Sequence, residues 1–101
     1  MHIISRKAIK EFIEIHPKSK SKSKSSLDSW YKIVKNNDFA GFNNLREVFP
    51  SVDKVKDLYV FNISGNYFRL IAAIHFNKLR LYIRHILTHA EYDKRTWKNE
   101  H

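Results

Sequence analysis

The segment 88–93, which reads THAEYD, contains two side chains that can move protons. A histidine accepts or donates a proton near neutral pH, and a tyrosine hydroxyl can hydrogen-bond or donate one. His89 and Tyr92 are three residues apart and would lie one turn apart on a helix. Arginines such as Arg69 and Arg84 bind phosphate through paired hydrogen bonds. Together these residue types suit metal-free transphosphorylation of RNA, which needs proton transfer and charge stabilisation at one phosphodiester.

Simpler interpretations of the same residues remain open. His89 can be a capping or packing histidine, and the two arginines can belong to a solvated face. Against the second interpretation, like charges on neighbouring strands repel and are usually avoided unless an anion bridges them. His85 and His89 also form an H-x-x-x-H pair. Because no third metal ligand is evident, the sequence predicts no metal and no other cofactor.

Three apolar runs from Leu58 onward must position these side chains. The runs are LYVFNI at Leu58–Ile63, NYFRLIAAIHF at 66–76 and KLRLYIRHILT at 78–88. The connections between them are short, which is typical of consecutive antiparallel hairpins. The sequence therefore predicts a β-meander, with Lys54 and Lys56 in the loop before it.

Side chains alternate between the two faces of a strand, so sequence parity assigns each one to a face. In the second run, the face toward the helices is apolar and consists of Phe68, Leu70, Ala72, Ile74 and Phe76. In the third run, the same face is expected to carry Leu79, Leu81, Ile83, His85 and Leu87. The opposite face of the third run then carries Arg80, Tyr82, Arg84 and Ile86. Arg69 and Arg84 are therefore expected on the same side of the sheet, on adjacent strands.

The third run leads directly into a helix start. Thr88 and Glu91 form the T-x-x-E pattern of a capping box. A short C-terminal helix is therefore expected to begin at His89, with Tyr92 one turn further on. Both side chains would lie near the edge of the sheet that displays Arg84.

The N-terminal half has a helical pattern. After a short strand at 3–4, apolar residues at helical spacing predict a helix that begins after Ser5 and ends before Pro17. A second helix, capped by Ser25 or Ser26, carries the apolar stripe Leu27, Trp30, Tyr31 and Val34. The KSKSKSK run at 18–24, between the two, predicts a solvated loop or a frayed helix start.

A third helical piece is expected within 39–50, before the meander. This order of elements predicts an α+β protein. Its two to three helices would pack on one face of the antiparallel meander, with a short strand at the N-terminus and a short helix at the C-terminus. We expect residues 1–101 to form a single domain.

Composition restricts the partners. The chain has 19 Lys and Arg against 10 Asp and Glu, for a net charge of +9. So basic a chain attracts polyanions such as RNA, DNA, acidic proteins or anionic membrane surfaces. It contains no cysteine, which excludes disulfides and thiolate metal sites. No apolar stretch approaches membrane-spanning length, so we expect a cytoplasmic protein without a membrane partner.

Two segments resemble the HigB toxins, a RelE-like family of bacterial type II toxin–antitoxin systems. They are VFNISGNYFRLIAAIHF at 60–76 and IRHILTHAEYD at 83–93. The start HIISRKAIKEF, the helix around Trp30 and the Phe49-Pro50 step also fit, so the resemblance covers nearly the whole chain. The combination of G-N-x-x-R with T-H-x-E-Y-D is specific at the level of the family.

The resemblance implies an mRNA interferase that cuts messenger RNA in the A site of the small ribosomal subunit, by attack of a ribose 2′-hydroxyl on the adjacent phosphate. Arg69 and Arg84 would stabilise the transition state, and His89 and Tyr92 would handle protons in an order that the sequence leaves open. Further nucleic-acid contacts are implied for Lys54, Lys56, Arg80, Asp93 and Lys94. The implied partner is a HigA-type helix-turn-helix antitoxin, and operator DNA would be bound only through that antitoxin.

Two other functions fit part of the sequence. A ParE-like toxin that binds gyrase could have the same fold, since RelE-like folds host both activities. A non-catalytic RNA- or DNA-binding module would explain the positive charge equally well. The pair of His89 and Tyr92 favours the nuclease, because a binding protein needs no proton transfer. Against the binding module, no helix-turn-helix pattern is present, and only Tyr67 and Tyr82 are candidates for stacking bases on strands.

Overall fold

A computed structural model describes residues 1–5, 7–15, 20–64 and 67–94 of the chain. The strands in this part are β1 (His2–Ile4), β2 (Asp53–Val55), β3 (Leu58–Ile63), β4 (Phe68–His75) and β5 (Arg80–Thr88). The helices are α1 (Lys7–Ile15), α2 (Lys20–Lys35), α3 (Phe42–Val48) and α4 (His89–Asp93), with a 3₁₀ turn at Phe76–Lys78. The predicted α+β class, with its short N-terminal strand and short C-terminal helix, is confirmed.

The strands form one sheet in the order β1-β5-β4-β3-β2. Strands β2 to β5 are antiparallel neighbours along the chain, and β1 pairs with β5 in parallel. The predicted meander is therefore confirmed, but the segment before it is not a loop. Lys54 lies in the edge strand β2, and Lys56 lies in the turn to β3 with a positive φ of 55°.

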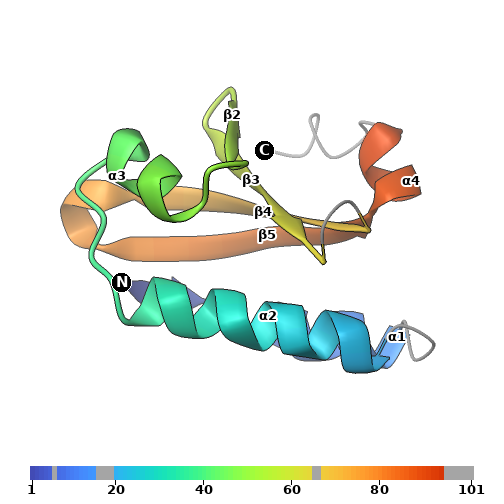
Figure 1. The fold of residues 1–101 in the computed structure, drawn as a ribbon. Helices are drawn as coiled ribbons and strands as arrows, with labels where there is room; N and C mark the ends of the chain where they lie inside the picture. Colours follow the sequence, from blue (N-terminus) through green and yellow to red (C-terminus); the bar gives the residue numbers. More distant parts are fainter. Residues whose placement is uncertain (6, 16–19, 65–66, 95–101) are drawn as a thin grey trace.

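The main core lies between one face of the sheet and the helices α1, α2 and α3, as predicted. Figure 1 shows α2 running along the sheet. Aromatic rings meet edge to face across this layer: Phe12 of α1 lies 5.0 Å from Phe68, and Trp30 of α2 lies 5.4 Å from Phe61. Phe49, which follows α3, lies 5.2 Å from the same Phe61 ring. Such pairs add specific geometry to the burial of large apolar surfaces. The helix-facing side of β3 and β4 is thereby fixed against three helices.

The helix boundaries differ from the prediction at one point. α2 begins at Lys20, before the serines that were expected to cap it. Ser26 is instead a residue inside the helix, and its hydroxyl accepts a hydrogen bond of 2.8 Å from the Ser64 hydroxyl. Lysine has a favourable helix propensity, so the KSKSKSK run can extend the helix backwards. The first two residues of that run, 18–19, lie outside the described residues.

The carbonyl groups at the C-terminal end of α2 accept hydrogen bonds from the ammonium group of Met1. The ammonium group of Met1 donates to the carbonyl oxygens of Val34 and Lys35, each at 3.3 Å, and to that of Asn37 at 2.8 Å. It also forms an ion pair of 3.0 Å with Asp38. Carbonyls at the C-terminal end of a helix lack partners within the helix and favour positive charge. These contacts tie β1, and through it the edge of the sheet, to α2.

Strand β5 contains one residue more than the segment of β4 opposite to it. Ile71 pairs with His85, while its neighbour Ala72 pairs with Ile83, so Arg84 has no partner in the ladder. This arrangement is a β-bulge, which adds a residue to one strand and shifts its alternation of faces. Sequence parity is therefore valid along β5 only up to Ile83.

The bulge makes part of the face prediction wrong. Before it, Leu81 and Ile83 are buried in the main core as expected. After it, Ile86 packs against that core, although parity assigned it to the opposite face. His85 and Leu87, which were expected in the core, lie on the opposite face, which we call the outer face. The single extra residue reverses the sides of all three.

The outer face has a small apolar cluster of its own. Its buried residues are Leu58, Val60 and Ile71, and Leu87 and Tyr92 pack against them. Tyr92 comes from α4, which lies at the end of β5, on the side of the sheet away from α2 (Figure 1). The outer face is thus partly covered at one end, which is where the candidate catalytic residues were expected.

We predict that deletion of Arg84 is tolerated by the fold, because the remaining residues of β5 then form a regular ladder with the same sides. As a matched control, deletion of Tyr82 should turn the fully buried Leu81 outward and cost about 1.5–3 kcal/mol. Urea unfolding of the two variants measures the difference. Equal destabilisation by both deletions would contradict the position of the bulge.

Candidate functional site

Arg69 of β4 is a buried cation. Its relative exposure is only 8%, and no carboxylate of the described residues forms an ion pair with it. Its Nη1 donates to the carbonyl oxygen of Phe68 at 3.1 Å, and its Nη2 lies 3.4 Å from Nδ1 of His89. A guanidinium carries five N–H donors, so these two contacts leave others available. A buried charge without a counter-ion is costly, which is the usual mark of a site for an anion.

The Tyr92 ring stacks against the Arg69 guanidinium. The guanidinium carbon lies 5.5 Å from the centroid of the Tyr92 ring, within the range of a cation–π contact. The ring also packs on the outer apolar cluster of Leu58, Val60 and Ile71. Tyr92 therefore links the position of Arg69 to the packing of α4 on the sheet.

The His89 imidazole lies between Arg69 and the carboxylate of Asp93. Its Nε2 lies 3.2 Å from Oδ2 of Asp93, and its Nδ1 faces Arg69. Because a guanidinium only donates, the contact at Nδ1 is a hydrogen bond when that nitrogen carries no proton, which leaves the proton on Nε2 for Asp93. The His89 side chain is 56% exposed, so a substrate can reach it. Asp93 is thus in a position to orient the imidazole.

The start of α4 places both His89 and Tyr92. The predicted capping box is present: the Thr88 hydroxyl accepts from the Glu91 backbone N–H at 3.3 Å, and the Glu91 carboxylate accepts from the Thr88 N–H at 3.0 Å. The N–H of His89 also donates to the carbonyl oxygen of Tyr67 at 3.0 Å. These bonds anchor a helix of only five residues to the end of the sheet.

Arg84 does not join this cluster. Arg69 pairs across the ladder with Leu87, which is three residues beyond Arg84, so about 10 Å of strand separates the two arginine positions. Two hollows are lined by Arg84, and neither contains Arg69 or His89. No contact between described residues joins the two arginines, and a phosphate site shared by both stays a prediction. Both were nevertheless assigned correctly to the outer side of the sheet.

The other expected nucleic-acid contacts are scattered. Asp93 and Lys94 lie beside His89, at the end of α4. Lys54 pairs with Tyr59 and its Nζ lies 5.9 Å from that ring, which belongs to the helix-facing core. Lys56 is exposed in the turn after β2, and Arg80 begins β5, at the end of that strand remote from α4. Of the five expected contacts, only Asp93 and Lys94 are on the same helix end as His89.

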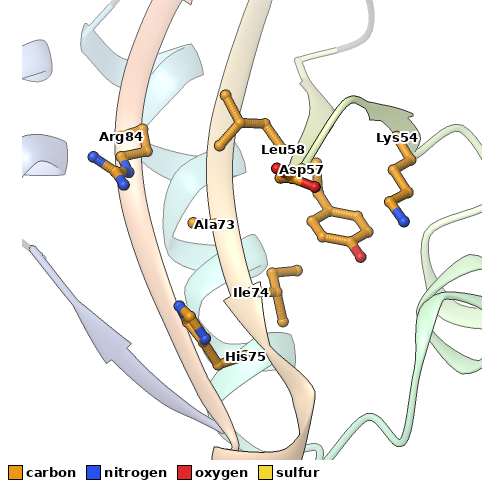
Figure 2. A pocket seen from close by; sticks show the side chains of 8 residues that line it. Lys54, Asp57, Leu58, Ala73, Ile74, His75 and Arg84 are labelled. Atoms are coloured by element: carbon orange, nitrogen blue, oxygen red, sulfur yellow. The ribbon is translucent and has the colours of Figure 1, made fainter. Parts of the chain in front are cut away.

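The two hollows lie side by side on the sheet and share Ala73, His75 and Arg84. The first, of about 350 Å³, extends toward Lys54, Asp57 and Leu58 (Figure 2). The second, of about 400 Å³, is lined by Ser5, Ala73, His75, Tyr82, Ile83 and Arg84, and we call it the Tyr82 hollow. Figure 2 shows Arg84 on β5 and His75 at the end of β4, with Ala73 between them.

Sequence reasoning did not single out His75 and Ala73 as site residues, although their parity on β4 is that of Arg69. His75 is exposed, and its ring meets Tyr82 edge to face at 5.4 Å. The signal was present, since His75 and Tyr82 have the parity of the outer face on adjacent strands. His85 also lies on that face, half-buried in β5, so the H-x-x-x-H pair does not form on a helix.

The cluster of Arg69, His89, Tyr92 and Asp93 can bind an anionic group and transfer a proton beside it. Such an arrangement suits the cleavage of a phosphodiester, and it lies on the face of the meander opposite to the main core. These features define the class of RelE-like toxins. Residues 23–95 match the family model described as "HigB_toxin, RelE-like toxic component of a toxin-antitoxin system". The chain belongs to this HigB family.

Curated relatives agree with the family. The chain is 37% identical over 99 residues to an "mRNA interferase HigB" of Escherichia coli O6:H1, which covers 95% of this chain and 92% of the relative. It is 38% identical over 96 residues to the "mRNA interferase toxin HigB" of Escherichia coli K12, covering 92% and 88% of the two chains. An "mRNA interferase HigB" of Shigella flexneri is similar to the same extent.

We predict that Thr88→Ala loosens α4. Loss of the capping hydroxyl should lower the free energy of unfolding by about 0.5–2 kcal/mol and accelerate amide exchange at the start of α4, because a helix of five residues depends on its cap. Thr88→Ser, which keeps the hydroxyl, serves as the control. Amide hydrogen exchange checks this, and equal protection in Thr88→Ala and the parent chain would contradict the anchoring role.

Proposed function

We propose that this toxin is an endoribonuclease that cleaves messenger RNA. The observation that carries the proposal is the buried Arg69, which has no carboxylate partner within the described part of the chain and which contacts His89 and Tyr92. A phosphate oxygen would supply the missing counter-charge through the unused N–H donors of the guanidinium. The names of the relatives as mRNA interferases support the same activity.

The proposed reaction is an attack of the ribose 2′-hydroxyl on the adjacent phosphate. A bond forms between the 2′-oxygen and phosphorus, the bond from phosphorus to the 5′-oxygen breaks, and the products are a 2′,3′-cyclic phosphate and a 5′-hydroxyl. One proton leaves the 2′-oxygen and one reaches the 5′-oxygen. His89, oriented by Asp93, transfers protons at the reacting phosphate, and the Tyr92 hydroxyl donates or hydrogen-bonds there. Arg69 binds the oxygens on which charge develops.

The proposed reaction uses no metal. Arg69 provides positive charge at the phosphate and His89 provides proton transfer, so the two tasks of a catalytic metal, charge stabilisation and activation of a nucleophile, are covered by side chains. In this proposal Asp93 and Lys94 extend the RNA contact next to α4, and Lys56 and Arg80 contact RNA or ribosome more remotely.

The two other functions fit the site less well. A gyrase-binding toxin of the same fold has no use for an exposed histidine held between an arginine and an aspartate. A non-catalytic RNA-binding module would place its cations on the surface, whereas Arg69 is buried beneath Tyr92. The nuclease is therefore the function that we propose.

The family implies an antitoxin that neutralises the toxin. For this chain, we propose that the antitoxin is a HigA-type helix-turn-helix protein and that operator DNA is contacted only through it. Within the part of the chain that the structure describes, no helix combines the length and the apolar character needed to cross a bilayer. A cytoplasmic location is proposed, because the message and the ribosome are there.

We predict that His89→Gln lowers the rate of mRNA cleavage by about 10²–10⁴-fold, because glutamine cannot act as an acid or base. Primer extension on cellular messages after induction measures the cleavage, and a thermal scan shows that the fold is retained. Lys7→Gln is the control, since it removes an exposed charge on α1, away from the site. Unchanged cleavage by His89→Gln would contradict the assigned site.

We also predict that cleavage depends on the ribosome. Purified toxin should cut a message in the A site of stalled ribosomes at least about a hundredfold faster than the same message free in solution, because the ribosome holds the nucleotides in a reactive orientation. The two rates are compared in a reconstituted translation system. Equal rates would exclude ribosome dependence but leave the endoribonuclease itself standing.

A further inference from the structure

The Tyr82 hollow has no role in the chemistry at Arg69 and His89, yet it has the features of a binding site. Its volume of about 400 Å³ is within the range of pockets that hold small molecules. Ala73 has a small side chain and forms part of its lining between His75 and Arg84 (Figure 2). A larger side chain at position 73 would fill this hollow, so the small side chain of Ala73 keeps it open.

The charges around this hollow favour an anion. None of its lining residues is acidic, and the exposed Arg84 makes no hydrogen bond or ion pair with any residue that the structure describes. Arg80, also exposed, pairs with His75 at one end of the hollow. Cations gathered on one face of adjacent strands repel unless an anion lies between them. Asp57 lies in the neighbouring hollow instead.

The hollow also offers ring surfaces. Tyr82 and His75 meet edge to face at 5.4 Å and both line it. Aromatic rings beside a cation are the combination with which proteins bind single-stranded nucleic acid, since bases stack on rings and phosphates pair with arginine.

The hollow lies on the same side of the sheet as the proposed cleavage site. Arg84 and Arg69 are on the same side of adjacent strands, and about 10 Å of β5 separates their positions. An RNA chain that presents its phosphate to Arg69 can therefore continue along the outer face toward Arg84. Arg84 is the bulged residue of β5, so its side chain is available on the outer face for such a phosphate contact.

We propose that the Tyr82 hollow binds a nucleotide of the RNA that flanks the cleaved phosphodiester, with the phosphate on Arg84 and the base against Tyr82 and His75. The inference rests on the proposed function and reassigns Arg84 from transition-state stabilisation to substrate binding. Arg84 and Tyr82 would then affect the affinity for RNA and the choice of cleavage position, whereas His89 would affect the chemical step.

The test uses the full chain carrying His89→Gln, so that the RNA stays intact. Fluorescence anisotropy measures its binding to a dinucleotide, which has one phosphodiester, and to a single-stranded pentanucleotide. We expect Arg84→Gln and Ala73→Leu, each added to that background, to weaken pentanucleotide binding about tenfold and to leave dinucleotide binding unchanged. Arg84→Gln should also reduce the slope of log K against log salt by about 0.7.

Lys7→Gln in the same background is the charge-matched control and should leave both affinities unchanged, while a thermal scan confirms folding. If the parent binds the dinucleotide and neither Arg84→Gln nor Ala73→Leu weakens pentanucleotide binding, the inference is overturned and the proposed function is unaffected. Binding of neither RNA overturns the inference, whereas the proposed function is tested separately by the cleavage of messages on ribosomes. If Ala73→Leu abolished antitoxin binding and left RNA affinity unchanged, the hollow would belong to a protein partner and the inference would fail.

Discussion

The arrangement of the whole outer face depends on one extra residue in β5. Because Arg84 bulges out of the ladder, Ile83 and Ile86 both face the helices although three positions separate them. Without the bulge, a strand that keeps Ile83 in the core would turn Ile86 toward solvent and His85 inward. The bulge thus allows β5 to complete the main core and also to add Leu87 to the outer apolar cluster, against which Tyr92 packs. The strand that stabilises the fold is for this reason the strand that positions the site.

The second constraint is the burial of a charge. Arg69 is held between the Tyr92 ring, the Phe68 carbonyl and His89, and none of these groups supplies the negative charge that would offset the desolvation of its guanidinium. A bound phosphate would complete its surroundings. Charge that is fixed in advance stabilises a transition state without having to reorganise. The geometry around Arg69 is therefore compatible with a toxin of the HigB family.

The helix that carries His89 and Tyr92 is too short to be stable by itself. Its capping box, the bond from His89 to the Tyr67 carbonyl and the packing of Tyr92 on the outer apolar cluster fix it to the sheet. The fold is shared by proteins with different activities, so it does not determine the chemistry. In the proposed function, the residues that transfer protons come from this helix of five residues, placed where β5 ends.

Much of this protein followed from the sequence, and the remainder depended on tertiary structure. The meander, the helix-facing residues of β4 and the capping box at Thr88 are local patterns, so periodicity and spacing were sufficient to predict them. The bulge at Arg84 was not predictable, because it is a matter of which residue of β5 faces which residue of β4. The separation of Arg84 from Arg69, and the burial of Arg69 under α4, follow from that pairing. Local patterns depend on neighbours in the chain, whereas register and burial depend on contacts that form only when distant strands meet.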